Sequence, residues 1–189
     1  ACFSGTQQAA PNLPFTQLDG SQHTISEFKG KVMLVNFWAT SCSTCVKEMP
    51  QLVSTYKKFQ GQGLETLAIA MEYDAPAYVM QFAQSRQLPF RVAIDHSGDL
   101  SKGFGEVQLT PTTFVVNKKG EIVKRYVGEP DFAALHGLLG QLLAQAGRAE
   151  VIRPRGRPWS TARVRVRTRA PKAAHYRCLL CQREPYPWH

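Results

Sequence analysis

Hydrophobic positions along the chain fall into continuous apolar runs separated by segments with helical spacing. The runs at 32–38 and 64–71 are apolar at almost every position, which is typical of strands covered on both faces. Shorter strands are expected at 90–94, 113–117 and 122–127. The last two are separated by Lys118-Lys119-Gly120-Glu121, which predicts a hairpin.

Between these strands, apolar residues recur every three or four positions, which predicts amphipathic helices. The longest spans 43–59, and Pro50 should kink it because proline supplies no backbone donor. Other helices are expected at 75–87, 100–104 and 131–146. A short hairpin over 15–25, followed by a helical turn that ends near Lys29, precedes the first long strand. This order predicts an α/β fold of three layers, with a mixed central sheet flanked by helices.

Charge divides the chain unevenly. Of its 189 residues, 23 are Lys or Arg and 14 are Asp or Glu, giving a net charge of +9. Residues 1–149 hold 13 basic and 12 acidic residues, whereas 150–189 hold 10 basic and 2 acidic residues. The basicity therefore belongs to the C-terminal segment, and a nucleic-acid partner is not expected for the whole protein. We expect a flexible leader at 1–10, one domain at 11–148 and a basic, disordered or non-native extension at 149–189.

The Arg-rich extension has two alternative interpretations. Its arginines alternate with small, apolar or proline residues, a pattern that would suit contact with nucleic acid or an anionic membrane. It also holds a set that could bind zinc, namely His175, Cys178, Cys181 and His189. The order of these ligands is unusual and no core-forming pattern surrounds them, so no metal is expected. An irregular extension is the leading interpretation.

The first residues of the chain bear on where in the cell the protein lies. Ala1-Cys2-Phe3-Ser4-Gly5 resembles the end of a bacterial lipoprotein signal, in which a small residue precedes a lipidated cysteine. Lipidation of Cys2 would tether the protein to a membrane, and a stray N-terminal cysteine is the alternative. A complete signal peptide is missing, so a mature or trimmed form is expected. No stretch approaches the ~18 consecutive apolar residues that a membrane helix needs.

Cys42-Ser43-Thr44-Cys45 is the strongest chemical signal, because it follows an apolar strand and opens a helix. Cysteines at this spacing can form a short disulfide. A leading thiol at a helix N-terminus faces unpaired N–H groups that favour its thiolate. A structural disulfide or half of a zinc site is the alternative, but zinc needs about four ligands and the body of the chain offers no second pair. A redox site is therefore predicted.

Three motifs in this chain resemble those of one family. Residues 37–50, from Phe37-Trp38 through both cysteines, are similar to the active-site segment of thioredoxin-fold proteins, and most similar to that of the TlpA/ResA-like thiol-disulfide oxidoreductases. Thr110-Pro111 and the strand after it resemble that family's cis-proline strand, and the hairpin at 119–122 follows in the same order. The resemblance covers about residues 11–147 and implies a thioredoxin-like fold.

The resemblance also implies roles for individual residues. Cys42 would be the attacking thiol, Cys45 the resolving thiol, and Pro111 would be cis beside them. Glu48 stands at the position of an acidic residue of this branch, where it could accept a proton from Cys45. An exposed helix acid that only complements the dipole is the alternative. Substrate contacts are expected at Trp38, Ser41, Thr110 and Pro111. Trp38 is expected to pack beside the site rather than to take part in chemistry.

Departures from the family pattern limit what the resemblance implies. Ser41 stands where a tryptophan usually precedes the first cysteine, and Ser43-Thr44 lacks the proline that often precedes the second. The redox potential therefore cannot be carried over. Asn36 stands where cytoplasmic thioredoxins have a buried aspartate, which leaves Glu48 as the expected proton acceptor.

By resemblance, the protein would reduce disulfides of exported proteins, such as apocytochrome c, in an oxidising periplasm where it would be membrane-anchored. A membrane thiol-electron donor of the DsbD or CcdA type would recharge it, and no cofactor is implied. A disulfide-donating oxidase and a non-catalytic thioredoxin-fold binding module are the alternatives. A peroxidase is disfavoured because no Thr-x-x-Cys motif leads to Cys42.

Overall fold

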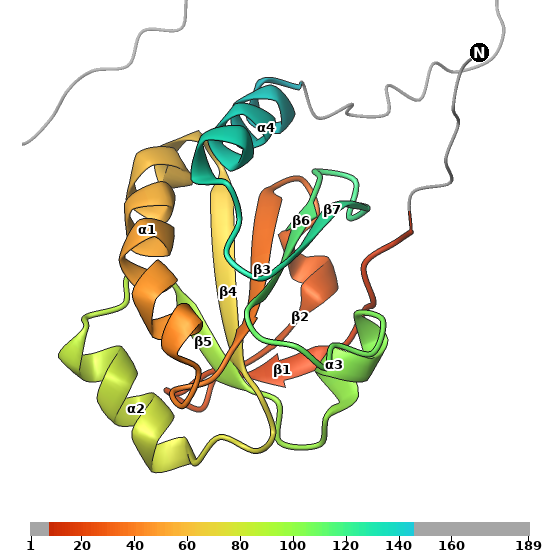
Figure 1. Ribbon diagram of the computed structural model, residues 1–189. Helices are drawn as coiled ribbons and strands as arrows, with labels where there is room; N and C mark the ends of the chain where they lie inside the picture. Colours follow the sequence, from red (N-terminus) through yellow and green to blue (C-terminus); the bar gives the residue numbers. More distant parts are fainter. Residues whose placement is uncertain (1–7, 146–189) are drawn as a thin grey trace, which may run out of the picture. The chain divides into compact units, whose positions relative to one another are not determined.

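A computed structural model describes residues 8–145, which form a five-stranded mixed sheet with helices around it (Figure 1). The sheet runs in the order β5-β4-β3-β6-β7. Its strands are β3 (Val32–Trp38), β4 (Leu64–Ala70), β5 (Arg91–Ile94), β6 (Thr112–Val116) and β7 (Ile122–Val127). The first three are parallel to one another, whereas β6 runs antiparallel to β3 and to β7. The expected mixed central sheet is confirmed.

Helical segments connect and cover these strands. They are η1 (Ile25–Phe28), α1 (Ser43–Phe59), η2 (Gln60–Gln62), α2 (Pro76–Ser85), α3 (Asp99–Gly103) and α4 (Phe132–Ala144). Pro50 lies inside α1, and the helix continues past it to Phe59. The expected N-terminal hairpin forms a separate sheet of β1 (Pro14–Thr16) and β2 (Gln22–Thr24).

The N-terminal hairpin is shorter than the sequence suggested, because Ile25 opens the 3-10 helix η1 instead of extending the strand. The Glu27 side chain explains the change. Its Oε1 accepts a 2.9 Å hydrogen bond from the backbone N–H of Thr24. This bond satisfies a backbone donor at the start of the helical turn and so favours the turn over a longer strand.

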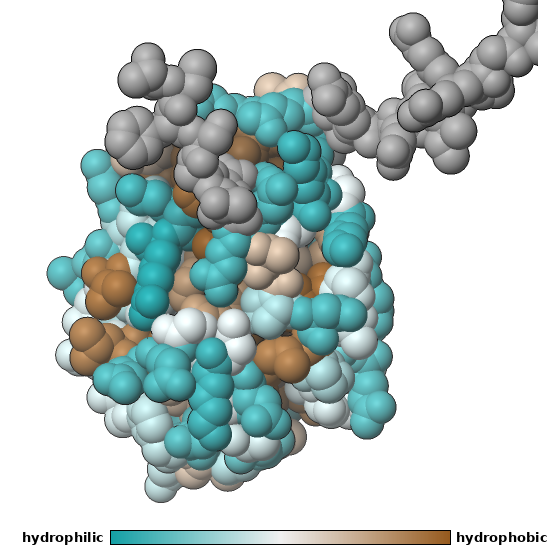
Figure 2. Space-filling model, turned by 90° about the vertical axis from the view of Figure 1, so that its right-hand side faces the viewer, coloured by the Kyte–Doolittle hydropathy of each residue, from teal (hydrophilic) through white to brown (hydrophobic). Residues whose placement is uncertain are grey.

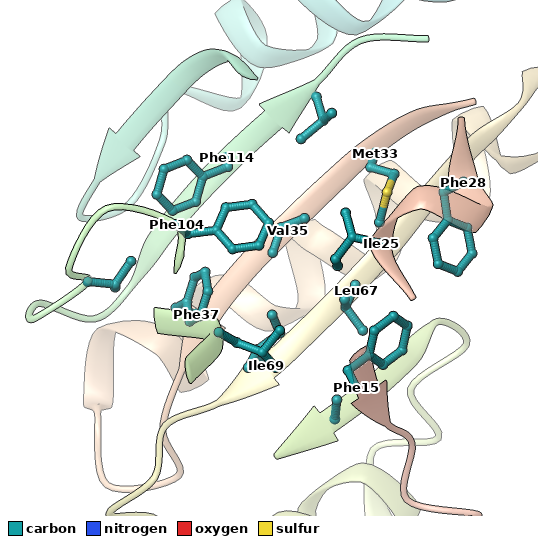
Figure 3. Packing of buried hydrophobic residues seen from close by; sticks show 14 of the residues in the cluster. Phe15, Ile25, Phe28, Met33, Val35, Phe37, Leu67, Ile69, Phe104 and Phe114 are labelled. Carbon is teal, nitrogen blue, oxygen red and sulfur yellow. The ribbon is translucent and has the colours of Figure 1, made fainter. Parts of the chain in front are cut away.

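Alternate residues of β3 point to opposite faces of the sheet, and each face has its own core. Met33, Val35 and Phe37 pack on the face covered by the N-terminal hairpin, η1 and α3. There Phe37, Phe104 and Phe114 group together (Figure 3), with ring centroids between 5.1 and 6.0 Å apart. The other face carries Val32, Leu34 and Trp38 and packs against α1, α2 and α4.

Asn36 shares the second face with Leu34 and Trp38, because β3 alternates with a period of two. It is fully buried. A buried carboxamide needs hydrogen-bond partners, so the β3 register brings a polar group to the side of the sheet on which α1 lies. This placement prepares the site described below.

The surface of the described part is mixed in polarity. On the face shown in Figure 2, hydrophobic side chains form separate patches among hydrophilic ones. Within residues 8–145, no helix has the length and apolar character required to cross a membrane. Cys2 and the whole expected extension at 149–189, including its four candidate zinc ligands, lie outside the described residues, as do residues 1–7 of the expected leader.

Candidate active site

The two cysteines lie where β3 gives way to α1. The backbone N–H of Cys42 donates to the carbonyl of Ala39 at 3.1 Å, which closes a turn after β3. Cys42 is the N-cap of α1, and its Sγ accepts a 3.2 Å hydrogen bond from the backbone N–H of Cys45. A disulfide joins the two residues, with their Cα atoms 5.2 Å apart. The first sulfur thus occupies the capping position at the positive end of the helix dipole.

The two sulfurs differ in access. Cys42 is partly exposed, whereas Cys45 has no exposed surface and packs with Met49 and Leu52. Their positions on α1 explain the difference, since Cys45, Met49 and Leu52 follow the helical period on the face that meets the sheet. An incoming sulfur can therefore reach Cys42 and cannot reach Cys45.

Pro111 forms the second wall of the site. The Thr110–Pro111 peptide bond is cis, and the Thr110 carbonyl oxygen lies 3.5 Å from Cys42 Sγ. Pairing of β6 with β3 brings the two segments together, because Thr112 lies opposite Phe37 near the end of β3. The Pro111 carbonyl accepts a 2.8 Å hydrogen bond from Gly128, which anchors this wall to the segment after β7.

Glu48 is fully buried on α1, one turn after Cys45. This burial excludes the alternative interpretation of Glu48 as an exposed acid that only complements the helix dipole. Burial raises the pKa of Glu48 to about 7, a hydrogen bond from Asn36 opposes this shift, and the nearby charge of Glu129 adds to it. A carboxyl group with this pKa can gain or lose a proton near neutral pH.

Asn36 links Glu48 to the strand that follows Pro111. Its Nδ2 donates to Glu48 Oε1 at 3.0 Å and to Thr113 Oγ1 at 2.9 Å. All three residues are fully buried. The sequence drew attention to Asn36 through the aspartate that it replaces, but no sequence signal identified Thr113.

Trp38 lies beneath the site rather than on its surface. It has no exposed surface, and its ring centroid lies 5.1 Å from that of Phe82 on α2. The substrate contact expected of Trp38 does not fit this geometry, because its side chain is covered by packing. Ser41 is exposed and Thr110 is partly exposed on either side of Cys42, so both remain accessible.

Asp74 is a site residue that sequence reasoning missed. It is 6% exposed, and its two carboxylate oxygens accept hydrogen bonds from Thr40 N and Thr40 Oγ1, each at 2.6 Å. Thr40 stands two positions before Cys42. Residues 8–145 contain no group of three or more His, Cys, Asp or Glu side chains that could hold a metal ion.

Comparison with known proteins places this geometry in a family. The family model described as Redoxin matches residues 5–139. The chain belongs to the Redoxin family. Among curated Redoxin relatives, thiol-disulfide oxidoreductase ResA of Bacillus thuringiensis subsp. konkukian is 37% identical over 120 residues, covering 64% of this chain and 68% of that protein. ResA of Bacillus subtilis is 32% identical over 141 residues, covering 72% and 78%.

Solved structures show similarity to thioredoxin-fold proteins. A thioredoxin-like protein from Neisseria meningitidis is 35% identical with a TM-score of 0.69, covering 75% of this chain and 93% of that one. An exposed lipoprotein thioredoxin from Streptococcus pneumoniae is 25% identical with a TM-score of 0.62, covering 70% and 100%. Together with the Cys42–Cys45 disulfide, these relatives support a ResA-like, thioredoxin-fold enzyme with thiol-disulfide oxidoreductase activity.

Proposed function

We propose that this enzyme reduces disulfides of exported proteins, with Cys42 as the attacking thiol and Cys45 as the resolving thiol. The observation that carries the proposal is the contrast between the two sulfurs. Cys42 is partly exposed and caps α1, whereas Cys45 is buried. A client disulfide would therefore meet Cys42 first. Ser41 and Thr110, which are exposed and partly exposed, would contact the client around it. Pro111 is buried and would hold the cis bond that shapes this wall rather than touch the client.

The first step is attack of the Cys42 thiolate on one sulfur of the client disulfide. The client S–S bond breaks as the Cys42–client bond forms, and the departing client thiolate takes a proton from solvent. The Cys45 N–H, 3.2 Å from Cys42 Sγ, and the N-terminus of α1 would stabilise the attacking thiolate.

The second step releases the client. The Cys45 thiol gives its proton to Glu48 and attacks Cys42 Sγ, so the Cys42–Cys45 bond forms and the second client sulfur leaves as a thiolate. The client has then gained two electrons, and the enzyme holds its disulfide. A pKa of about 7 matches Glu48 to this proton transfer at neutral pH. A reduced donor thiol must then recharge the pair.

Insulin reduction tests the activity, and a potential tests its direction. With dithiothreitol as the electron donor, the protein should precipitate insulin chains catalytically, and Cys42→Ala should abolish this turnover. Equal client binding without turnover in both proteins would instead identify a binding module. A reduction potential near the DsbA end of the range, about −120 mV, would overturn the reductase direction in favour of an oxidase.

The location and the electron donor are part of the same proposal. We infer an extracytoplasmic enzyme tethered through lipid on Cys2 and recharged by a membrane donor of the DsbD or CcdA type, with cytochrome c maturation as one route of use. Its similarity to an exposed lipoprotein thioredoxin supports this inference. Membrane fractionation of the natural full-length protein and its Cys2→Ser variant tests the tether, since loss of lipid should release the protein from membranes.

A further inference from the structure

We propose that Asp74 is a positioning residue for the attacking thiol: it fixes the turn that carries Cys42 by binding Thr40 from a loop that sequence motifs do not include. The proposal rests on the proposed role of Cys42 as attacking thiol. It adds a third segment, residues 71–75 after β4, to the two walls formed by the CxxC segment and the Pro111 segment.

The contact between Asp74 and Thr40 uses the whole carboxylate. Oδ2 accepts from the Thr40 backbone N–H and Oδ1 from the Thr40 hydroxyl, each at 2.6 Å. Hydrogen bonds to a carboxylate are shorter and stronger than neutral ones. Because Asp74 is only 6% exposed, water competes little for its oxygens. Asp74 binds Thr40 through both its backbone and its side chain, so the two bonds together fix the position and the orientation of Thr40.

Asp74 does not serve the helix that follows it. It directly precedes Ala75, the N-cap of α2, and an aspartate near this position commonly caps a helix. Yet both oxygens of Asp74 accept from Thr40, and the N-cap Ala75 has no side chain that could cap the helix. The Asp74 carboxylate turns instead to the loop between β3 and α1. Local helix stability therefore does not explain this aspartate.

Thr40 lies inside the turn that sets the Cys42 sulfur. This turn is closed by the Cys42 N–H donating to the Ala39 carbonyl at 3.1 Å, and Thr40 is the first residue within it. Cys42 then places Sγ against the Cys45 N–H at 3.2 Å. If the turn loosens, Sγ loses its fixed position at the helix N-terminus, and the thiolate loses stabilisation that depends on that position.

The same loop also reaches the other wall of the site. The hydroxyl of Tyr73 lies 3.5 Å from Thr110 Oγ1, next to the cis peptide bond. The loop is held at its start by Met71, whose N–H donates to the Trp38 carbonyl at 3.0 Å at the end of β3. Neighbouring residues of one loop therefore contact both the Cys42 side and the Pro111 side.

A positioning role and a purely electrostatic role predict opposite results. The negative charge of Asp74 by itself disfavours a nearby thiolate, so its removal would lower the pKa of Cys42. Loss of positioning would raise the pKa of Cys42, because the thiolate would lose its fixed place against the helix N–H groups. Asp74→Asn removes the charge and replaces one acceptor oxygen with an NH₂ group, so the two bonds to a carboxylate become weaker neutral ones. Thr40→Val removes only the hydroxyl and keeps the charge.

The experiment measures alkylation of Cys42 by iodoacetamide against pH in the reduced full-length protein, which reports the pKa of this thiol. The Cys42 peptide is followed by mass spectrometry, because Cys2, Cys178 and Cys181 are also thiols. We expect Asp74→Asn and Thr40→Val both to raise that pKa and to slow alkylation at pH 6 by about threefold or more. Thr40→Ser keeps both donors and should restore the native profile. Combining Asp74→Asn with Thr40→Val should add little to either single change, since both break one contact.

Asp95 supplies a matched control. It is 2% exposed at the end of β5, and its carboxylate also accepts two hydrogen bonds, from the N–H groups of Leu100 and Ser101 in α3. Asp95→Asn should lower stability without changing the alkylation profile. A lowered or unchanged Cys42 pKa in Asp74→Asn, or the same shift in Asp95→Asn, overturns the proposal. Insulin reduction by the native protein is measured in parallel, so a failure of the proposed enzyme activity is seen separately from a failure of the positioning role.

Discussion

Asn36 on β3 donates to Glu48 on α1 at 3.0 Å, and the same nitrogen donates to Thr113 on β6 at 2.9 Å. One buried carboxamide thus connects the helix that carries the cysteines with the strand that follows Pro111. Its bond to Glu48 favours the ionised carboxylate, whereas burial favours the protonated form. The balance between these two effects sets the pKa of Glu48, the acidic residue nearest to the two cysteines in the sequence.

Asn36→Leu should raise the pKa of Glu48 above about 7, because it removes the hydrogen bond that stabilises the carboxylate. A rise of about one unit is expected for the loss of one hydrogen bond to a charged group. Carbon-13 NMR of the glutamate carboxyl groups in the disulfide form measures the titration directly. Thr113→Val removes the second bond of Asn36 and should leave the Glu48 pKa close to native. A pKa that stays the same or falls in Asn36→Leu contradicts this account.

Stability of the disulfide form should fall with rising pH because of Glu48. The pKa of Glu48 is about 7 in the folded protein against an ordinary value of 4.5, so the folded state binds this proton more tightly. The resulting loss in the free energy of unfolding is absent below pH 4.5, grows between pH 4.5 and pH 7, and is complete above pH 7. It amounts to at most about 3 kcal/mol for a shift of this size.

Glu48→Gln should remove this penalty. Urea unfolding at pH 5 and pH 8 measures it as the difference in the free energy of unfolding, which should shrink in the variant. Glu129→Gln is the control. It removes a charge that raises the Glu48 pKa, so the pH range over which stability falls should move slightly lower. An equal pH dependence in native protein and Glu48→Gln would show that Glu48 does not titrate in this range.

His136 on α4 should act in the opposite direction. Its Nε2 lies 2.8 Å from Thr55 Oγ1, its ring packs against Phe59 and Phe132, and burial lowers its pKa from 6.5. Because the pKa of His136 is lower in the folded protein, the neutral ring contributes fully to stability above pH 6.5. This contribution is lost as the pH falls below 6.5. His136→Gln should reduce acid destabilisation below pH 6.5, measured by thermal unfolding. The Glu48→Gln variant should retain that acid sensitivity, which separates the two groups.

The sequence predicted those parts of the site that lie within short contiguous segments. Cys42, Cys45 and Glu48 share one helix, so their spacing alone places them within its first two turns. Contacts between distant segments were not predictable in this way. Thr40 and Asp74 are 34 positions apart, and Asn36 and Thr113 are 77 apart. Only the order and register of the strands bring these pairs together, and a single sequence does not specify that register for an individual side chain.

Cys45→Ala should trap clients as mixed disulfides on Cys42. The variant keeps the partly exposed attacking thiol but lacks the buried thiol that releases the client. Incubation of the reduced variant with a disulfide peptide should give a stable adduct by mass spectrometry, and dithiothreitol should remove it. Peptide mapping locates the adduct, since the chain also holds Cys2, Cys178 and Cys181. Cys42→Ala should give no adduct on Cys45 at neutral pH, because Cys45 has no exposed surface. An adduct of similar yield mapped to Cys45 of Cys42→Ala would mean that Cys45 is accessible and would reverse the assignment of the two sulfurs.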